Sequence, residues 1–308
     1  MNSAHRSINA PNHLQWMAHT PNIQHLRIDE LILPGSHNSG SDKQAPETGL
    51  IFSEIAQDVS PLEQLRGGIR VLDLRVVFHA QYVQGDPARF QLFHLTSSGR
   101  TVAVDIVEGV RHYLDEIESA GATAKEIIIL DFHQFKDFTD QAHAELQTLL
   151  FIELGSRVIP YSMHGWTVEH IWTFHPGKNV VVAYNDGRVV EDGWDGVSQR
   201  WPGENLFNTN TLKTFVDQVA REYQPAQTLT AVQCAKYSLP FHAPSDLSHK
   251  VDEWFESVDE NSFIQNFYII NTDWSLRSDL VNQCRHANEI RGARKETHPD
   301  EHLQPLRR

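Results

Sequence analysis

The sequence has few of the features that mark secreted miniproteins, membrane proteins or thiolate metal modules. It contains only two cysteines, Cys234 and Cys284, and neither is part of a CxxC pair. Neither a disulfide framework nor a thiolate zinc site is therefore expected, and we predict two ordinary buried thiols. No apolar run approaches the roughly 20 residues that span a bilayer. The first residues also lack the apolar segment of a secretory signal. These absences predict a soluble protein, either cytoplasmic or secreted after loss of a leader.

Basic side chains are also scarce. The chain of 308 residues carries 26 Lys and Arg against 40 Asp and Glu, which gives a formal net charge of −14. Binding to nucleic acid needs a positive surface that displaces counterions from phosphates, so no nucleic-acid partner is expected. The same balance argues against a polybasic membrane anchor, although a local patch could still touch lipid. With 40% hydrophobic residues, the chain can bury a core.

Short β-branched segments alternate with segments of helical period along the chain. The predicted strands are 30–33, 68–77, 89–94, 126–132, 179–184, 228–233 and 266–272. The predicted helices are 101–120, 141–154, 211–223, 247–258 and 276–289. This alternation predicts a mainly parallel sheet covered by helices, and no linker divides it. We expect one α/β domain over residues 1–290, a distorted TIM-type (β/α) barrel, with an open doubly wound sheet as the alternative. Residues 291–308 are predicted to be a charged, frayed tail.

Polar side chains gather where the predicted strands end. Pro34 and Gly35 are expected to break the first strand and leave His37 at its lip. Asp73 and Arg75 share one face of the second strand, because alternate residues of a strand point the same way. Further candidates at strand ends are His94, Asp131, His133 and Asp273. The carboxyl ends of the strands of a parallel barrel meet at one rim, so we expect these side chains to converge.

Two histidines beside a fixed arginine suit acid–base chemistry on an anion. One imidazole would take a proton from a nucleophile, the other would protonate a leaving oxygen, and the guanidinium would neutralise the developing charge. A zinc site using His94, His133 and Asp73 is disfavoured, because Arg75 would place a permanent cation in it. The sequence has no GxSxG elbow, P-loop or GxGxxG after a strand. A phosphodiester is the natural substrate for such a site.

Three motifs at strand ends carry a resemblance to a known family. They are Leu-Pro-Gly-Ser-His-Asn-Ser at 33–39, Gly-Ile-Arg-Val-Leu-Asp-Leu-Arg at 68–75 and Glu-Ile-Ile-Ile-Leu-Asp-Phe at 126–132. In this order, most clearly over residues 27–135, the chain resembles the X domain of phosphatidylinositol-specific phospholipase C. The bacterial single-domain enzymes and the eukaryotic X-domain-containing proteins are the nearest branches. The resemblance implies a distorted α/β barrel that cleaves phosphatidylinositol, at a membrane surface, into diacylglycerol and inositol 1,2-cyclic phosphate.

The resemblance also implies a role for each candidate residue. His37 matches the general base, His94 the general acid with His79 as the fallback, and Arg75 the group that holds the phosphate. Asp73 would support Arg75, and Asp273 would orient the base. Substrate contacts would come from Asn38, Asp131, His133 and Tyr184.

Asn38 bears on the question of calcium. The metal-dependent branch of the family uses an asparagine there as a ligand, but that branch also needs a carboxylate near Val71, and valine cannot ligate. Because Arg75 takes the place of the metal, the resemblance favours an enzyme without a cofactor, and calcium is the disfavoured alternative. Two other functions stay open. One is a metal-dependent phosphodiesterase for another head group, against which the absence of a Glu-x-Asp pair at 71–73 counts, and the other is a catalytically silent barrel that binds phosphoinositides.

Three aromatic residues are candidates for membrane contact. Trp194 and Trp201 lie in a glycine-rich stretch, 186–210, that is predicted to be a long loop, and Phe241 lies near two prolines. Aromatic rings favour the headgroup depth of a bilayer, which would give a peripheral, transient contact. The alternative for the tryptophans is that they fold back and cap the barrel.

Overall fold

Strands and helices alternate along the residues that the computed structural model describes, which are 13–46, 54–188, 192–203, 208–223, 225–237 and 242–298. The strands are β1 (Leu33–Ser36), β2 (Val71–Phe78), β3 (Phe90–Phe93), β4 (Ser97–Thr101), β5 (Ile128–Lys136), β6 (Val180–Tyr184), β7 (Trp194–Asp195), β8 (Ser198–Arg200), β9 (Thr230–Cys234) and β10 (Ile269–Thr272). The α-helices are α1 (Pro61–Arg66), α2 (Gly109–Ser119), α3 (Asp140–Leu154), α4 (Val168–Phe174), α5 (Thr209–Val219), α6 (Ser248–Trp254) and α7 (Leu280–Thr297). A π-helical turn, Val102–Glu108, leads into α2.

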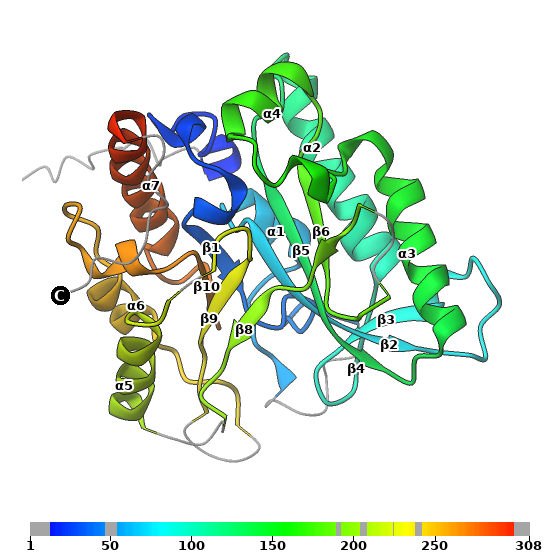
Figure 1. Ribbon diagram of the computed structural model, residues 1–308. Helices are drawn as coiled ribbons and strands as arrows, with labels where there is room; N and C mark the ends of the chain where they lie inside the picture. Colours follow the sequence, from blue (N-terminus) through cyan, green and yellow to red (C-terminus); the bar gives the residue numbers. More distant parts are fainter. Residues whose placement is uncertain are drawn as a thin grey trace, which may run out of the picture.

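The strands form one curled sheet in the order β7-β6-β5-β2-β1-β10-β9-β8, and every pair along this path is parallel. Residues 194–200 join the two ends of the path, because this short segment pairs first with β6 as β7 and then with β9 as β8. Figure 1 shows the helices arranged outside the strands. The architecture is therefore a single-domain, distorted α/β barrel, as the alternating pattern predicts.

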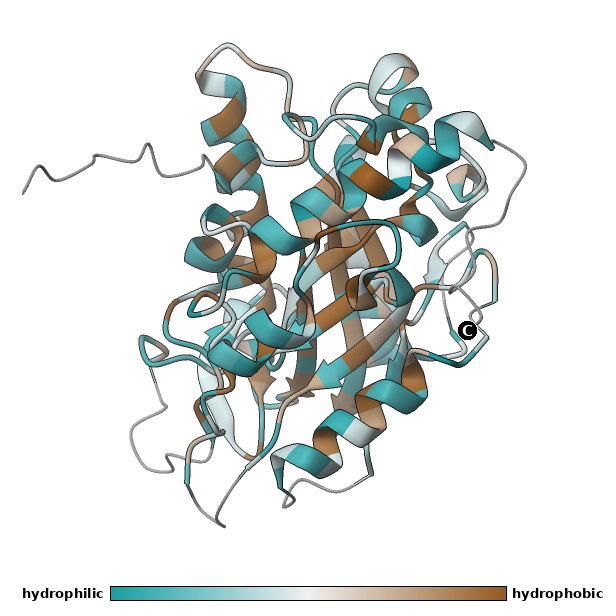
Figure 2. Ribbon diagram, turned by 90° about the vertical axis from the view of Figure 1, so that its left-hand side faces the viewer, coloured by the Kyte–Doolittle hydropathy of each residue, from teal (hydrophilic) through white to brown (hydrophobic). Residues whose placement is uncertain are grey.

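Apolar side chains fill the space between the sheet and the helices. The strands β5 and β6 are rich in Ile and Val, and Figure 2 shows hydrophobic residues concentrated in the strands at the centre. A second buried cluster lies between β9, β10 and helices α5, α6 and α7. Cys234 and Cys284 belong to it as free, buried thiols, which confirms the prediction for both. Among the described helices, none has the length and hydropathy that a bilayer crossing requires.

The antiparallel part of the sheet differs from the prediction. The segment 89–94 was expected to be a parallel barrel strand, but β3 pairs antiparallel with β2, and β4 pairs antiparallel with β3. β2 is eight residues long, so its last residues extend past the barrel and β3 returns along them. This ribbon projects from the barrel in Figure 1. The stretch 186–210, expected to be a loop, contains β7 and β8.

The end of the chain is more ordered than predicted. Helix α7 continues to Thr297, so the expected frayed tail from residue 291 is wrong up to that point; residues 299–308 lie outside the described residues. Arg291 and Lys295 are both buried, and both contact Glu30. Arg291 donates a hydrogen bond to the carbonyl oxygen of Glu30 (2.7 Å), and Lys295 forms an ion pair with its carboxylate (2.8 Å). Charged side chains one helical turn apart can both be buried when each has a partner of opposite charge or a hydrogen-bond acceptor.

Candidate active site

The ends of β1 and β10 bring a histidine and a carboxylate together. Ser36 lies opposite Thr272 in this parallel pair, and the following residues are His37 and Asp273. Nδ1 of His37 lies 2.8 Å from Oδ1 of Asp273, and both side chains are 2% exposed. Burial raises the pKa of Asp273, while the neighbouring His37 opposes that shift. A carboxylate can only accept, so Nδ1 carries the proton and Nε2 of neutral His37 is free to act as a base.

A glycine in β1 makes this close pairing possible. A Cβ atom on Gly35 would lie 1.9 Å from Oδ1 of Asn271, on β10. Pro34 and Gly35 therefore do not break the first strand, as the sequence suggested, but lie inside β1. A larger residue at position 35 would displace the buried side chain of Asn271, two residues before Asp273.

Arg75 and Asp73 enter the site from β2. Nη2 of Arg75 lies 3.5 Å from Nε2 of His37, the nitrogen that faces away from Asp273. Asp73 is fully buried, and Nε2 of Gln233 donates to its Oδ2 at 3.3 Å. Burial alone would raise the pKa of Asp73, but the nearby His133, His37 and Arg75 hold it well below the usual range. Asp73 therefore carries a negative charge, and both it and the guanidinium of Arg75 lie close to His37.

His94 approaches from the turn between β3 and β4. Its ring centroid lies 6.4 Å from that of His37, and its Nδ1 lies 3.3 Å from the carbonyl oxygen of Glu54. The ring of Tyr237 lies 6.4 Å away from it. Burial, the positive charge of Arg75 and the neighbouring His37 lower the pKa of His94 to about 3. The structure thus places His94 beside the candidate base, whereas the fallback His79 contacts Gln81 and Tyr82 in the loop after β2.

A β-bulge lies at His133 on β5. The register between β2 and β5 shifts by one residue, so Arg75 pairs with Gln134 rather than with His133. Bulges of this kind redirect a side chain next to a site. Nδ1 of His133 lies 2.9 Å from Oδ1 of Asp73. Burial opposes the charged imidazole, but Asp73 outweighs that effect and raises the pKa of His133.

Asp131 lies directly opposite Asp73 in the register of β5 and β2. Its side chain is fully buried and accepts a hydrogen bond from Nε2 of Gln199. Burial, and to a smaller extent the negative charge of Asp73, raises the pKa of Asp131 to about 7, against the opposing effect of His133. Two carboxyl groups therefore face each other inside the barrel with opposite protonation preferences.

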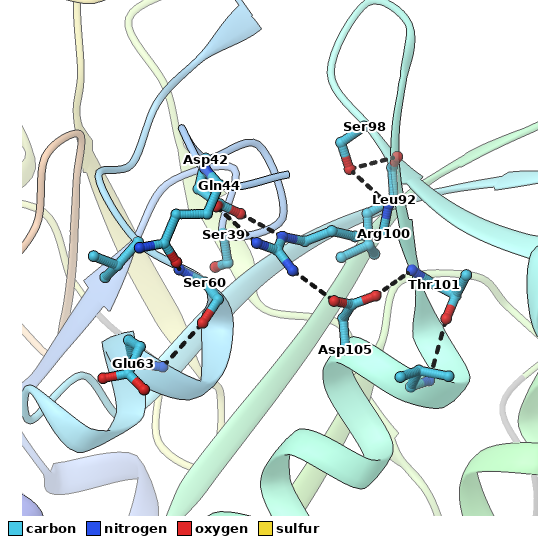
Figure 3. Close-up of polar contacts among 12 residues, drawn as sticks. Ser39, Asp42, Gln44, Ser60, Glu63, Leu92, Ser98, Arg100, Thr101 and Asp105 are labelled. Carbon is cyan, nitrogen blue, oxygen red and sulfur yellow. Dashed lines mark hydrogen bonds and ion pairs between the residues drawn. The ribbon is translucent and has the colours of Figure 1, made fainter. Parts of the chain in front are cut away.

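The loop after His37 is anchored to the β3–β4 ribbon. Nη2 of Arg100 donates to Oδ1 of Asp42 at 2.8 Å, and Nη1 donates to Oδ1 of Asp105 at 2.6 Å, at the start of the π-helical turn. Figure 3 shows Arg100 between these two carboxylates. The ribbon that carries His94 and the loop that follows His37 are thereby fixed to each other.

Two predicted contacts lie elsewhere. Tyr184 was expected to contact substrate, but it is on the outer face of β6, where its hydroxyl lies 2.9 Å from Nδ1 of His143 of α3. Trp194 was proposed for the membrane surface, but it is 2% exposed and donates from Nε1 to the carbonyl of Ile159 at 2.8 Å. Both predictions are wrong in placement. Phe241 lies outside the described residues.

Trp201 and Asn38 both adjoin His37. The ring of Trp201 stacks on the ring of His37 with centroids 5.6 Å apart and planes 25° apart, so it covers the base. It remains partly exposed. Asn38 has a left-handed backbone (φ 48°), and its buried amide has no hydrogen-bond partner among the described residues. An unpaired amide next to the base is free to bind a polar ligand.

Sequence reasoning missed four polar residues of the site. Gln199 and Gln233 lie on β8 and β9 inside the barrel, Tyr237 faces His94, and Gln57 contacts the backbone of His37. Gln233 could have been found, because it ends a predicted strand as the histidines do. Gln57 and Gln199 had no strand pattern to mark them.

Among the described residues, no three His, Cys, Asp or Glu side chains are grouped as the ligands of a metal ion would be.

The fold and this cluster define an α/β barrel with a His–Asp pair and an arginine at the carboxyl rim of its strands. No protein-family model matches the chain. PI-PLC X domain-containing protein 3 of Danio rerio is 25% identical over 217 residues, 62% of this chain and 62% of that protein. PI-PLC X domain-containing protein 1 of Homo sapiens is 23% identical over 223 residues, 65% and 64% of the two chains. The match thus spans less than two thirds of each relative.

Solved structures resemble nearly the whole chain. Phosphatidylinositol-specific phospholipase C from Listeria monocytogenes has a TM-score of 0.62 at 17% identity, covering 91% of this chain and 98% of that one. The corresponding enzyme of Staphylococcus aureus has a TM-score of 0.63 at 13% identity, covering 90% and 98%. The chain therefore has the barrel fold of these bacterial enzymes. The resemblance that the three sequence motifs predicted is confirmed.

Proposed function

We propose that this protein is a phosphodiesterase that cleaves phosphatidylinositol into diacylglycerol and inositol 1,2-cyclic phosphate without calcium. The observation that carries the proposal is the position of His37, with Nδ1 held by Asp273 and Nε2 3.5 Å from Arg75. The similarity to PI-PLC X domain-containing proteins and to bacterial phospholipases C supports the choice of substrate. The contact with the membrane that holds this substrate is peripheral.

The reaction needs one proton acceptor, one proton donor and one cation. Nε2 of His37 accepts the proton of the inositol 2-hydroxyl, and that oxygen attacks the phosphorus. The bond between phosphorus and the glycerol oxygen breaks, and His94 protonates the departing oxygen. Arg75 neutralises the negative charge that grows on the non-bridging oxygens. The products are a five-membered cyclic phosphate and diacylglycerol, so no water is consumed.

His94 can donate a proton in this scheme only when a bound anion raises its low pKa. Burial and the positive charge of Arg75 keep His94 neutral, with a pKa of about 3. A phosphodiester next to Arg75 adds a negative charge, which offsets the guanidinium and raises the proton affinity of His94. Substrate binding thereby prepares the acid.

Independence from calcium is supported by the groups around His37. A divalent ion there would have to lie next to the guanidinium of Arg75, whose charge repels it. Position 71, where a carboxylate ligand would be needed, is an apolar valine buried in β2. Arg75 supplies the positive charge that a metal would otherwise contribute.

Phosphorus NMR of the products formed from phosphatidylinositol vesicles tests the proposal. We expect a cyclic phosphate resonance, with the same rate in buffer containing EDTA. His37→Ala should lower the rate by about 10²–10⁴. His143→Ala is the matched control, because His143 is also buried but lies outside the barrel against Tyr184. A wild-type protein that forms no cyclic phosphate contradicts the reaction, and loss of activity in EDTA contradicts only its independence from calcium.

A further inference from the structure

Gln57 connects the two strand ends that carry the His37–Asp273 pair. Its side chain is buried, and Nε2 donates to the carbonyl oxygens of His37 (2.8 Å) and Thr272 (3.0 Å). Oε1 accepts from the backbone nitrogen (3.0 Å) and the hydroxyl (2.9 Å) of Ser275. A glutamine amide has two donor hydrogens and two acceptor lone pairs, so all of its hydrogen-bonding capacity is used.

The backbone next to Gln57 is fixed to the same two segments. The amide nitrogens of Ala56 and Gln57 donate to the carbonyl of Ser41, at 2.8 and 3.2 Å, in the loop that follows His37. The carbonyl of Ala56 accepts from the nitrogen of Trp274 at 2.8 Å, directly after Asp273. The segment therefore lies between the chain after His37 and the chain after Asp273, bonded to both.

The same short segment also holds the candidate acid. The carbonyl oxygen of Glu54 lies 3.3 Å from Nδ1 of His94, and its carboxylate accepts from the hydroxyl of Thr96 at 2.6 Å. Residues 54–57 thus contact all three chain segments that supply the base, its carboxylate and the acid. The amide of Gln57 has no donor or acceptor left for a substrate, because the protein uses all of them.

We propose that Gln57 is a positioning residue that sets the distance between His37 and Asp273, an inference that rests on the proposed function. The last backbone bond between the two strands runs from the nitrogen of His37 to the carbonyl of Thr272, at 3.0 Å. Beyond it, the side chains of His37 and Asp273 depend on other contacts for their alignment. The amide of Gln57 supplies them, because it bonds to His37, to Thr272 directly before Asp273 and to Ser275 two residues after it. Gln57 acts on the reaction through His37, without touching the substrate.

Asn288 offers a matched control at the other end of the barrel. Its buried amide donates to the carbonyls of Ile32 (2.7 Å) and Cys284 (2.9 Å) and accepts from the nitrogen of Ile32 (2.9 Å). Like Gln57, it joins a strand to another element through a fully buried amide. Unlike Gln57, it contacts neither His37 nor the neighbours of Asp273.

The experiment compares Gln57→Glu, Ser275→Ala and Asn288→Asp in the full chain. The carboxylate of Gln57→Glu keeps the shape of the amide but loses its two donors, and Ser275→Ala removes one bond while leaving Gln57 in place. We expect Gln57→Glu to lower kcat on phosphatidylinositol by about 10–100-fold with KM within about 3-fold, since a displacement of about 1 Å costs that much. The low-field proton NMR signal of Nδ1 of His37 should shift or broaden in Gln57→Glu, and less strongly in Ser275→Ala. Asn288→Asp should lower Tm but leave kcat and the His37 signal unchanged.

Each possible result supports or overturns the positioning role of Gln57. An unchanged kcat and His37 signal in folded Gln57→Glu, or an equal loss of kcat in Asn288→Asp, overturns the positioning role. Should Gln57→Glu fail to fold, Ser275→Ala decides through the His37 signal, and a signal identical to wild type overturns the role. The NMR readout needs no turnover. If wild type forms no cyclic phosphate while Gln57→Glu still moves the His37 signal, the proposed reaction fails and the positioning role stands.

Discussion

Oδ1 of Asp273 lies 2.8 Å from Nδ1 of His37 in a contact from which water is excluded, since both side chains are buried. The two residues are 236 positions apart in sequence and meet because β1 and β10 are adjacent in the barrel. The contact fixes the tautomer of the imidazole. It also leaves Nε2, the nitrogen nearest Arg75, as the one without a proton.

Replacing Asp273 by Asn should therefore impair the reaction without unfolding the chain. An amide can donate to Nδ1, which favours the tautomer with the proton on Nε2, and that nitrogen can no longer act as a base. We expect kcat on phosphatidylinositol to fall by about 10²–10⁴ with little change in KM. The rate of cyclic phosphate formation measures this, and circular dichroism controls for folding. A variant with more than a tenth of wild-type kcat would mean that the tautomer is set by another contact.

Arg75→Lys should also be strongly impaired, although it preserves the charge. A lysine ammonium is a point charge, whereas a guanidinium can bind two phosphate oxygens at once and contact Nε2 of His37 as well. We expect kcat/KM to fall by at least about 10²-fold, within the range seen for lost transition-state donors. Steady-state kinetics with and without added calcium provides the check. Rescue of Arg75→Lys by calcium would show that a metal can take over the role of the arginine.

Strand periodicity predicted much of the site. His37, Asp73, Arg75 and Asp273 all lie at the carboxyl rim, because alternate residues of parallel strands point to one side and these ends share one edge. Tyr184 was misplaced since β6 is apolar along its whole length, so the sequence contains no alternation that shows which residues face inward. Only the register, in which Ala183 pairs with the inward-facing Asp131, places Tyr184 outside.

Other parts of the site depend on geometry that no local pattern encodes. His94 reaches the site because β3 returns antiparallel along the projecting end of β2, whereas a parallel strand was predicted. The one-residue bulge at His133, which pairs Arg75 with Gln134, was not predicted either. Gln57 bonds to residues 20 and 215 positions away, so its role follows from tertiary contacts alone.

The pKa of His94 should rise when an anion binds. Burial, the positive charge of Arg75 and the neighbouring His37 hold it at about 3. A bound phosphate group offsets Arg75, so protonation becomes easier. Titration of the histidine Cε1 protons by NMR, with inositol 1-phosphate absent and then saturating, should show an increase of at least about one unit. His94→Asn assigns the signal. An unchanged pKa in the saturated protein would exclude His94 as the acid.

Asp131→Asn should stabilise the protein at pH 8 relative to wild type. Burial raises the pKa of Asp131 from 3.8 to about 7, so the folded state binds a proton that the unfolded state has released between these values. A raised pKa contributes stability that is fully present below about pH 4 and is lost as pH rises to about 7. Asparagine does not titrate and avoids burying a charge. Urea unfolding at pH 5, 6, 7 and 8 should show a difference between Asp131→Asn and wild type that grows in favour of the variant, and a constant difference would contradict the shift.

Trp201→Ala should slow the cleavage of a water-soluble, short-chain substrate as well as of vesicles. The indole stacks on the imidazole of His37, with centroids 5.6 Å apart, and thereby restricts the ring and covers it from water. Loss of this cover should reduce kcat on monomeric substrate by about 10-fold, since orientation of the base is part of the rate. Trp201→Phe, which retains an aromatic face, should recover most of the activity. If Trp201→Ala instead lowers only vesicle binding and leaves monomeric substrate unaffected, the tryptophan serves the membrane surface and the stacking on His37 does not contribute to the reaction.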